Sequence, residues 1–88
     1  MPEQSIVVHN RVGLHSRPAA LFVQTAKRFP KTRIEVAKAD QVRDAKSILG
    51  VLTLAVTLGT EITIRTEGDD ADAALAALVE IVESGLGE

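Results

Sequence analysis

The chain has 88 residues, of which 45% are hydrophobic, and its ten Lys and Arg against twelve Asp and Glu give a net charge of −2. This length fits one domain over residues 1–88, and the composition excludes an intrinsically disordered chain. The lack of cysteine in the sequence excludes a disulfide framework and a thiolate metal site. No apolar run approaches the roughly 20 residues of a membrane span. The start "MPEQSIVVHN" does not have the pattern of a signal peptide, so we expect a cytoplasmic protein without a membrane partner.

The first half of the chain predicts a strand, a helix and two further strands. The β-branched run Ser5–His9 is typical of a strand. From Ser16 onward, apolar residues recur at helical spacing, which predicts an amphipathic helix that ends before Pro30. Residues 32–45, "TRIEVAKADQVRDA", then alternate in polarity and predict two short strands joined at "AKAD". The apolar positions of the helix are Ala19, Phe22, Val23, Ala26 and Phe29.

The second half predicts a short helix, a strand and a final helix. "SILGVLTLAV" (47–56) fits a strand or a helix by periodicity, but Ser47 as a candidate N-cap and the leucine-rich composition favour a short helix. Alternation in "TEITIRT" (60–66) predicts a strand. "DDADAALAALVEIVESG" (69–85) predicts a helix that stops at Gly85. Its expected buried stripe is Ala71, Ala74, Leu75, Leu78, Ile81 and Val82.

The resulting order is β-α-β-β-α-β-α. Helices lie between some of the strands, but the chain is too short for a doubly wound parallel sheet. We therefore predict an α+β fold, in which a four-stranded, mainly antiparallel sheet has its helices packed on one face.

The charges are divided along the chain. All ten Lys and Arg lie at or before Arg65, whereas residues 66–88 contain seven acidic residues and no basic one. The first 65 residues therefore have a net charge of +5, which suggests a basic face for anionic partners or phosphate. A solvated acidic helix explains the C-terminal acidic residues at least as well.

"RVGLHSRPAA" (11–20) places a histidine at the entrance of the first predicted helix. If the helix begins at Ser16, the free N–H groups of its first turn and the helix dipole form an anion site in front of His15. Arg17 adds a guanidinium that can hold phosphate oxygens by bidentate hydrogen bonds. A neutral imidazole can attack phosphorus, and the resulting phosphoramidate is labile enough to be passed on. From these residues alone, His15 is either such a carrier or a structural or solvated side chain.

Two motifs carry a resemblance to a known family. "GLHSRPAA" (13–20) resembles the active-site signature of HPr, the histidine-containing phosphocarrier family of the bacterial phosphoenolpyruvate-dependent sugar phosphotransferase system. "KSILGVLTL" (46–54) resembles that family's second motif, and the similarity extends over essentially the whole chain to the "GLGE" ending. The resemblance implies an open-faced β-sandwich of four antiparallel strands and three helices. It also implies a phosphoryl carrier without a cofactor and without independent turnover.

The resemblance assigns roles to the residues around the histidine. His15 would be phosphorylated on Nδ1 by phospho-enzyme I. Arg17 would stabilise the phosphate and help to release it to an enzyme IIA component. Ser16 would contribute its backbone N–H, as Arg17 does, together with a capping hydroxyl. Pro18 would fix the first helical turn.

The resemblance also implies a docking surface beside His15 and a second phosphorylation site. For the leucines, the alternative to docking is ordinary core packing. Ser47 matches a serine that an ATP-dependent HPr kinase/phosphorylase phosphorylates in many Gram-positive relatives, and a plain N-cap hydroxyl is the alternative. The expected docking surface comprises Ala20, Lys27, Ile48, Leu49 and Leu52.

Other functions fit the sequence less well. A carrier of the nitrogen-related phosphotransferase branch would use the same chemistry with other partners, although "KSILGVLTL" favours the sugar branch. A small nucleic-acid-binding domain calls for aromatic stacking residues or a GxxG loop, which the sequence lacks, so no nucleic-acid partner is expected. His9 and His15 lack further ligands for a metal, so none is predicted. A shuttle that presents one face to successive partners favours a monomer.

Overall fold

A computed structural model describes residues 2–87 of the chain. Within these residues, the strands and helices follow each other in the order that the sequence predicts. They are β1 (Glu3–Val7), α1 (Ser16–Lys27), β2 (Thr32–Lys38), β3 (Gln41–Asp44), α2 (Ile48–Thr53), β4 (Glu61–Gly68) and α3 (Ala71–Glu83).

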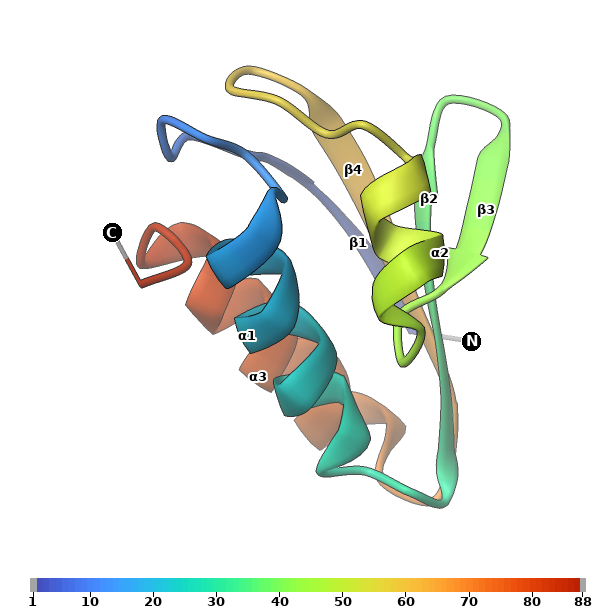
Figure 1. Cartoon of the computed structure of the whole chain (residues 1–88). Coiled ribbons are helices and arrows are strands. Elements are labelled where there is room, and N and C mark those ends of the chain that lie inside the picture. The colour runs from blue at the N-terminus through green and yellow to red at the C-terminus, as the bar shows by residue number, and fades with distance from the viewer. Residues whose placement is uncertain (1, 88) are drawn as a thin grey trace.

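The strands form one antiparallel sheet in the order β1-β4-β2-β3. β4 pairs with β1 on one side, where Thr63 lies opposite Ser5, and with β2 on the other, where Ile64 lies opposite Val36. The helices all lie on one face of this sheet and leave the other face open (Figure 1). This arrangement confirms the predicted α+β fold and the open-faced sandwich that the resemblance implies.

The core lies between the sheet and the helices. Ile62 and Ile64 of β4 are fully buried, which confirms the alternation predicted for that strand. In α3 the predicted stripe is buried at Ala74, Leu78 and Val82, and the other predicted positions are partly buried. Val79 is also buried, because α3 packs against α1 as well as against β4 and so buries a wider arc than predicted. Burial of each large aliphatic side chain contributes about 1.5–3 kcal/mol relative to exposure.

The first strand is displaced from the predicted range, Ser5–His9, because β1 spans Glu3–Val7. Val8 still hydrogen-bonds across the end of the sheet, since its N–H donates to Thr60 O at 2.9 Å and its carbonyl accepts from Gly59 N at 2.7 Å. His9 lies beyond the end of the strand, and its Nε2 lies 2.8 Å from the carbonyl oxygen of Glu83 at the end of α3. The β-branched run therefore identifies the strand, but the pairing with β4 sets its ends.

The end of α3 is closed by a Schellman motif. Gly85 has a φ of 89°, its N–H donates to Val82 O at 3.1 Å, and the N–H of Leu86 donates to Ile81 O at 2.8 Å. These bonds satisfy carbonyls that would otherwise lack partners at the helix terminus, which confirms Gly85 as the stop. They also turn Leu86 back into the core, beside the start of α1.

The helices place the predicted site at one end of the molecule. α1 and α2 pack against each other, and α2 ends on the side of the molecule where α1 begins (Figure 1). The loop from β1 to α1 and the segment that follows α2 therefore meet, which brings His15 close to residues 56 and 57. A search of residues 2–87 for a helix with the length and apolar character of a membrane span finds no such helix.

Candidate functional site

The loop that precedes His15 is fastened to the segment after α2. Gly13 donates its N–H to Asn10 O at 3.2 Å, which closes a turn, and Leu14 donates its N–H to Val56 O at 3.0 Å. Leu14 is buried, and Gly13 has a φ of 61°, a conformation that glycine adopts without steric cost. The residue before His15 is thereby anchored both by its side chain and by its backbone.

His15 is the N-cap residue of α1, as the sequence predicts. Its backbone is extended (φ −88°, ψ −172°), and its carbonyl accepts the first intrahelical hydrogen bond from Ala19 N at 2.7 Å. The side chain is exposed and makes no capping hydrogen bond to the part of the chain that the structure describes. The imidazole is therefore presented to solvent in front of the first turn.

The first turn of α1 supplies a positive environment without any acidic residue. Ser16 and Arg17 are its first two residues, and their N–H groups precede the intrahelical pattern. The helix dipole adds about half a positive charge at this end. Pro18, which has no N–H, occupies the third position and is buried. The geometry suits an anion held in front of the helix, next to the His15 side chain.

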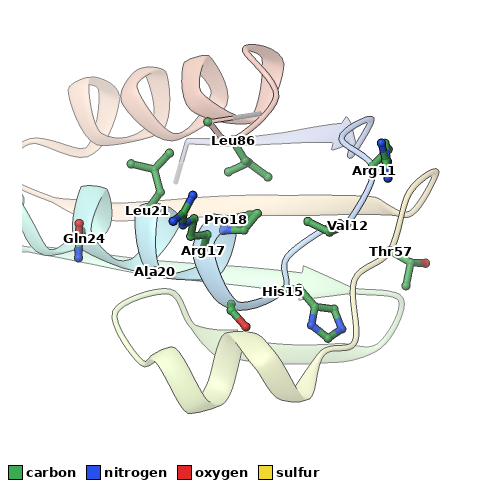
Figure 2. A pocket seen from close by; sticks show the side chains of 12 residues that line it. Arg11, Val12, His15, Arg17, Pro18, Ala20, Leu21, Gln24, Thr57 and Leu86 are labelled. Atoms are coloured by element: carbon green, nitrogen blue, oxygen red, sulfur yellow. The ribbon is translucent and has the colours of Figure 1, made fainter.

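A surface hollow of about 950 Å³ lies at this end of the molecule (Figure 2). In Figure 2 the imidazole of His15 lies on the side of α2, whereas the Arg17 side chain extends along the side of Leu21. The two side chains thus share the hollow without meeting. Its lining consists of Arg11, Val12, His15, Ser16, Arg17, Pro18, Ala20, Leu21, Gln24, Thr57, Leu86 and Gly87.

The predicted docking residues on α2 are exposed rather than part of the core. Ile48, Leu49 and Leu52 have exposed fractions of 43%, 70% and 39%, whereas Val51 of the same helix is fully buried. Ala20 on α1 is partly buried and Lys27 at the end of α1 is exposed. Clustered exposed apolar side chains are typical of interaction sites. Docking through Ala20, Lys27, Ile48, Leu49 and Leu52 stays a prediction.

Ser47 is the N-cap of α2. Its Oγ accepts a hydrogen bond from Gly50 N at 3.0 Å, and the side chain is partly buried. A Cβ atom at Gly50 would lie 3.2 Å from the same Oγ, so a larger residue at position 50 would press against the capping side chain. The structure thus accounts for Ser47 as a capping residue, and its phosphorylation stays a prediction.

The remaining candidates lie outside this site. The contact of His9 with Glu83 O directs it to the end of α3. A search of residues 2–87 for three or more His, Cys, Asp or Glu side chains that could hold a metal ion finds no such group. Arg33 and Arg65, which belong to the basic first 65 residues, form exposed ion pairs with Glu35 and Glu3 on the sheet. Such pairs contribute at most about 1 kcal/mol.

A family model gives the decisive comparison. The family described as "PTS HPr component phosphorylation site" matches residues 2–84. The chain belongs to the PTS HPr family. The predicted resemblance is confirmed, and with it the assignment to the phosphocarriers of the phosphotransferase system.

Individual relatives agree with the family assignment. The phosphocarrier protein HPr of Pseudomonas putida is 41% identical over 85 residues, which cover 96% of this chain and 93% of the relative. The HPr-like protein Crh of Halalkalibacterium halodurans is 43% identical over 83 residues, which cover 94% of this chain and 98% of the relative.

Solved structures are similar over the full length of the chain. The crystal structure of HPr-C-His from Thermoanaerobacter tengcongensis has a TM-score of 0.96 and 46% identity, and the match covers 100% of this chain and 98% of that one. An HPr dimer from the same organism has a TM-score of 0.80 at 46% identity, with full coverage of both chains. These structures confirm the fold. Because a similar protein has been solved as a dimer, the monomer expected for this chain stays a prediction.

Proposed function

We propose that this member of the HPr family accepts a phosphoryl group from phospho-enzyme I on Nδ1 of His15 and delivers it to a sugar-specific enzyme IIA component. The exposed His15 imidazole at the N-cap of α1 carries this proposal. A side chain that receives and releases a group must be reachable by both partners. The anion that it acquires must also be stabilised where it forms, and the start of α1 provides this stabilisation.

The chemistry needs only the residues of this chain and the donor. The Nδ1 lone pair attacks phosphorus, and the N–P bond forms as the bond from phosphorus to the donor breaks. The N–H groups of Ser16 and Arg17 and the Arg17 guanidinium offset the negative charge of the phosphoryl oxygens. Transfer to enzyme IIA reverses the sequence, with the N–P bond breaking as the acceptor attacks. Catalysis in each direction consists of positioning and electrostatic stabilisation, shared between carrier and partner, so the protein has no independent turnover.

The exposed part of α2 gives both partners one surface on which to dock. Leu49 and its neighbours Ile48 and Leu52 lie on the helix that packs beside α1, whose first turn carries the His15 site. Ala20 also lines the hollow and so extends this surface towards it. The exposed Lys27 would lie at the rim of the docking surface. Enzyme I and enzyme IIA would bind to this surface one after the other. The surface must therefore be free of other subunits, which favours a carrier that acts as a monomer.

Ser47 is the proposed regulatory position, as a substrate of an HPr kinase/phosphorylase. Phosphate on its Oγ would lie at the start of α2, next to the exposed side chains of Ile48 and Leu49. It would add about 1.5–2 negative charges at the edge of an otherwise apolar docking surface and so weaken the docking of acidic partners. The similarity to Crh of Bacillus subtilis, which is described as a catabolite repression HPr, favours regulation as a second role for this chain.

Phosphorylation in the purified system tests the proposal. The protein would be incubated with phosphoenolpyruvate, Mg²⁺ and enzyme I, and its intact mass measured before and after mild acid. We expect one added phosphate that acid removes, that His15→Ala abolishes and that Ser47→Ala retains. Absence of phosphate with an active cognate enzyme I would contradict the carrier function. Delivery to a sugar-specific enzyme IIA, rather than to the IIA component of the nitrogen-related branch, then tests the choice between the two branches.

A further inference from the structure

Asn10 lies in the loop between β1 and α1 and is almost completely buried, with an exposed fraction of 4%. Its side-chain Nδ2 donates a hydrogen bond to the carbonyl oxygen of Gly13 at 2.8 Å. Its own backbone carbonyl accepts a hydrogen bond from Gly13 N at 3.2 Å. One residue therefore holds both polar groups of the glycine that stands two positions before His15.

The nitrogen end of the Asn10 amide makes the contact that matters for the loop. Oδ1 has no hydrogen-bond partner among residues 2–87, whereas Nδ2 is bonded to Gly13 O. A side chain that could only accept hydrogen bonds would therefore lose the contact even if it had the same shape. A substitution that removes the donor but keeps the shape can therefore distinguish hydrogen bonding by Asn10 from packing by Asn10.

The contact is transmitted along the backbone to His15. Because Asn10 fixes the carbonyl of Gly13, it sets the plane of the peptide that joins Gly13 to Leu14. The N–H of that peptide donates to Val56 O at 3.0 Å. Leu14 is buried, and the next residue is the N-cap of α1. Glycine has the widest choice of backbone conformations, so without the two bonds from Asn10 the backbone at Gly13 would be held only from its Leu14 side.

We propose that Asn10 is a positioning residue for phosphoryl transfer, which acts by holding Gly13 so that the His15 imidazole stands in front of the first turn of α1. The inference rests on the proposed function of His15. Asn10 itself contacts neither the phosphoryl group nor the partner, because it is buried. Its effect is on the geometry of attack, where a displacement of about 1 Å can reduce a rate by about a hundredfold.

Substitutions at Asn10 separate the donor from the shape of the side chain. Asn10→Asp keeps the shape but presents a carboxylate that cannot donate to Gly13 O at neutral pH, so we expect kcat for phosphorylation by enzyme I to fall about tenfold or more. Asn10→Ala should behave in the same way. Asn10→Ser retains a short donor of the kind that forms similar turns and should recover part of the rate. KM should stay within about twofold of the wild-type value in every variant, because the docking surface on α2 is unchanged.

Thr66→Val is the matched control. The Oγ1 of Thr66 is a fully buried donor to a backbone carbonyl, that of Ala71, at 2.7 Å. This bond joins β4 to the start of α3, which lies at the opposite end of the molecule from the start of α1 (Figure 1). Its loss should lower the thermal midpoint while kcat stays within about twofold of the wild-type value. Rates are measured where circular dichroism shows each variant to be folded.

Two results would overturn the inference. One is an Asn10→Asp protein that is folded and phosphorylated at the wild-type kcat, with only a lowered midpoint as in Thr66→Val. The other is an Asn10→Ser protein no faster than Asn10→Asp. The wild-type protein in the same assay distinguishes this failure from that of the proposed function. If the wild type takes up no phosphate at His15, the carrier function itself is contradicted.

Discussion

A Cβ atom at Gly13 would lie 2.2 Å from the carbonyl oxygen of Val56, well inside van der Waals contact. The same oxygen accepts the N–H of Leu14 at 3.0 Å. The loop before His15 and the segment after α2 are thus joined by backbone alone at a point where no side chain fits. The position of His15 therefore depends on residues from two distant parts of the chain.

Gly13→Ala should destabilise the protein by about 2–4 kcal/mol, because the new methyl group adds a clash with Val56 to the cost of a positive φ. Gly59→Ala is the matched control, since Gly59 has a φ of 89° but a Cβ there would meet no atom within 4 Å. Gly59→Ala should cost only about 1–2 kcal/mol. Denaturant unfolding of both variants measures the difference. Equal losses would show that Val56 does not restrict the loop.

Local signals in the sequence predicted the start of each helix that bears on the site. The apolar spacing after Ser16 and the hydroxyl of Ser47 are signals carried by each helix's own residues, and the structure has the expected N-caps at His15 and Ser47. The need for glycine at position 13 arises from contact with Val56, and the burial of Asn10 arises from the folded loop. Neither relationship produces a periodic pattern of apolar residues in the sequence. In the sequence, Gly13 is compatible with any flexible turn, and Asn10 belongs to no pattern that indicates burial.

The sequence also could not predict where the Arg17 side chain lies. It suggested a guanidinium poised for phosphate, whereas in Figure 2 the side chain extends along Leu21, away from the imidazole. Arg17 is exposed and only two residues from His15, so rotation about its side-chain torsions can bring it to a phosphoryl group. In the proposed phosphohistidine, the negative charge on His15 would supply the attraction for this movement.

Arg17→Ala should slow phosphoryl transfer by about tenfold or more, because it removes a cation that offsets charge as the N–P bond forms and breaks. Its free energy of unfolding should change by less than about 0.5 kcal/mol, since the side chain is exposed. Arg17→Lys should recover part of the rate, because it restores the charge without the bidentate geometry. Rapid-quench measurement of transfer from phospho-enzyme I gives the rates.

Arg28→Ala serves as the control for Arg17. Arg28 is an exposed arginine just beyond the other end of α1, with its guanidinium 5.8 Å from the centre of the Phe29 ring. Its loss changes the net charge equally but leaves the His15 site intact. If both variants slow transfer to the same extent, the effect of Arg17 is one of overall charge and not of contact with phosphate.

Leu49→Ala should raise KM for phospho-enzyme I by about tenfold, since Leu49 is 70% exposed at the centre of the proposed docking surface. Stability should be nearly unchanged for the same reason. Val42→Ala removes an apolar side chain that is 42% exposed on β3, away from the docking surface, and should leave KM unaltered. Steady-state kinetics of phosphorylation compare the two variants. An unchanged KM in Leu49→Ala would place the docking surface elsewhere.

Two substitutions at Ser47 should separate its capping role from the effect of charge on docking. Ser47→Ala removes the acceptor for Gly50 N, so we expect a loss of about 1 kcal/mol, which lowers the melting midpoint of a domain this small by roughly 4–8 °C. Its phosphorylation at His15 should be normal.

Asp is itself a good N-cap, so Ser47→Asp should retain stability. Its carboxylate lies beside Ile48 and Leu49, so it should slow phosphorylation by raising KM. Thermal unfolding and steady-state kinetics test both variants, and a Ser47→Asp protein with wild-type KM would show that charge at this position does not reach the docking surface.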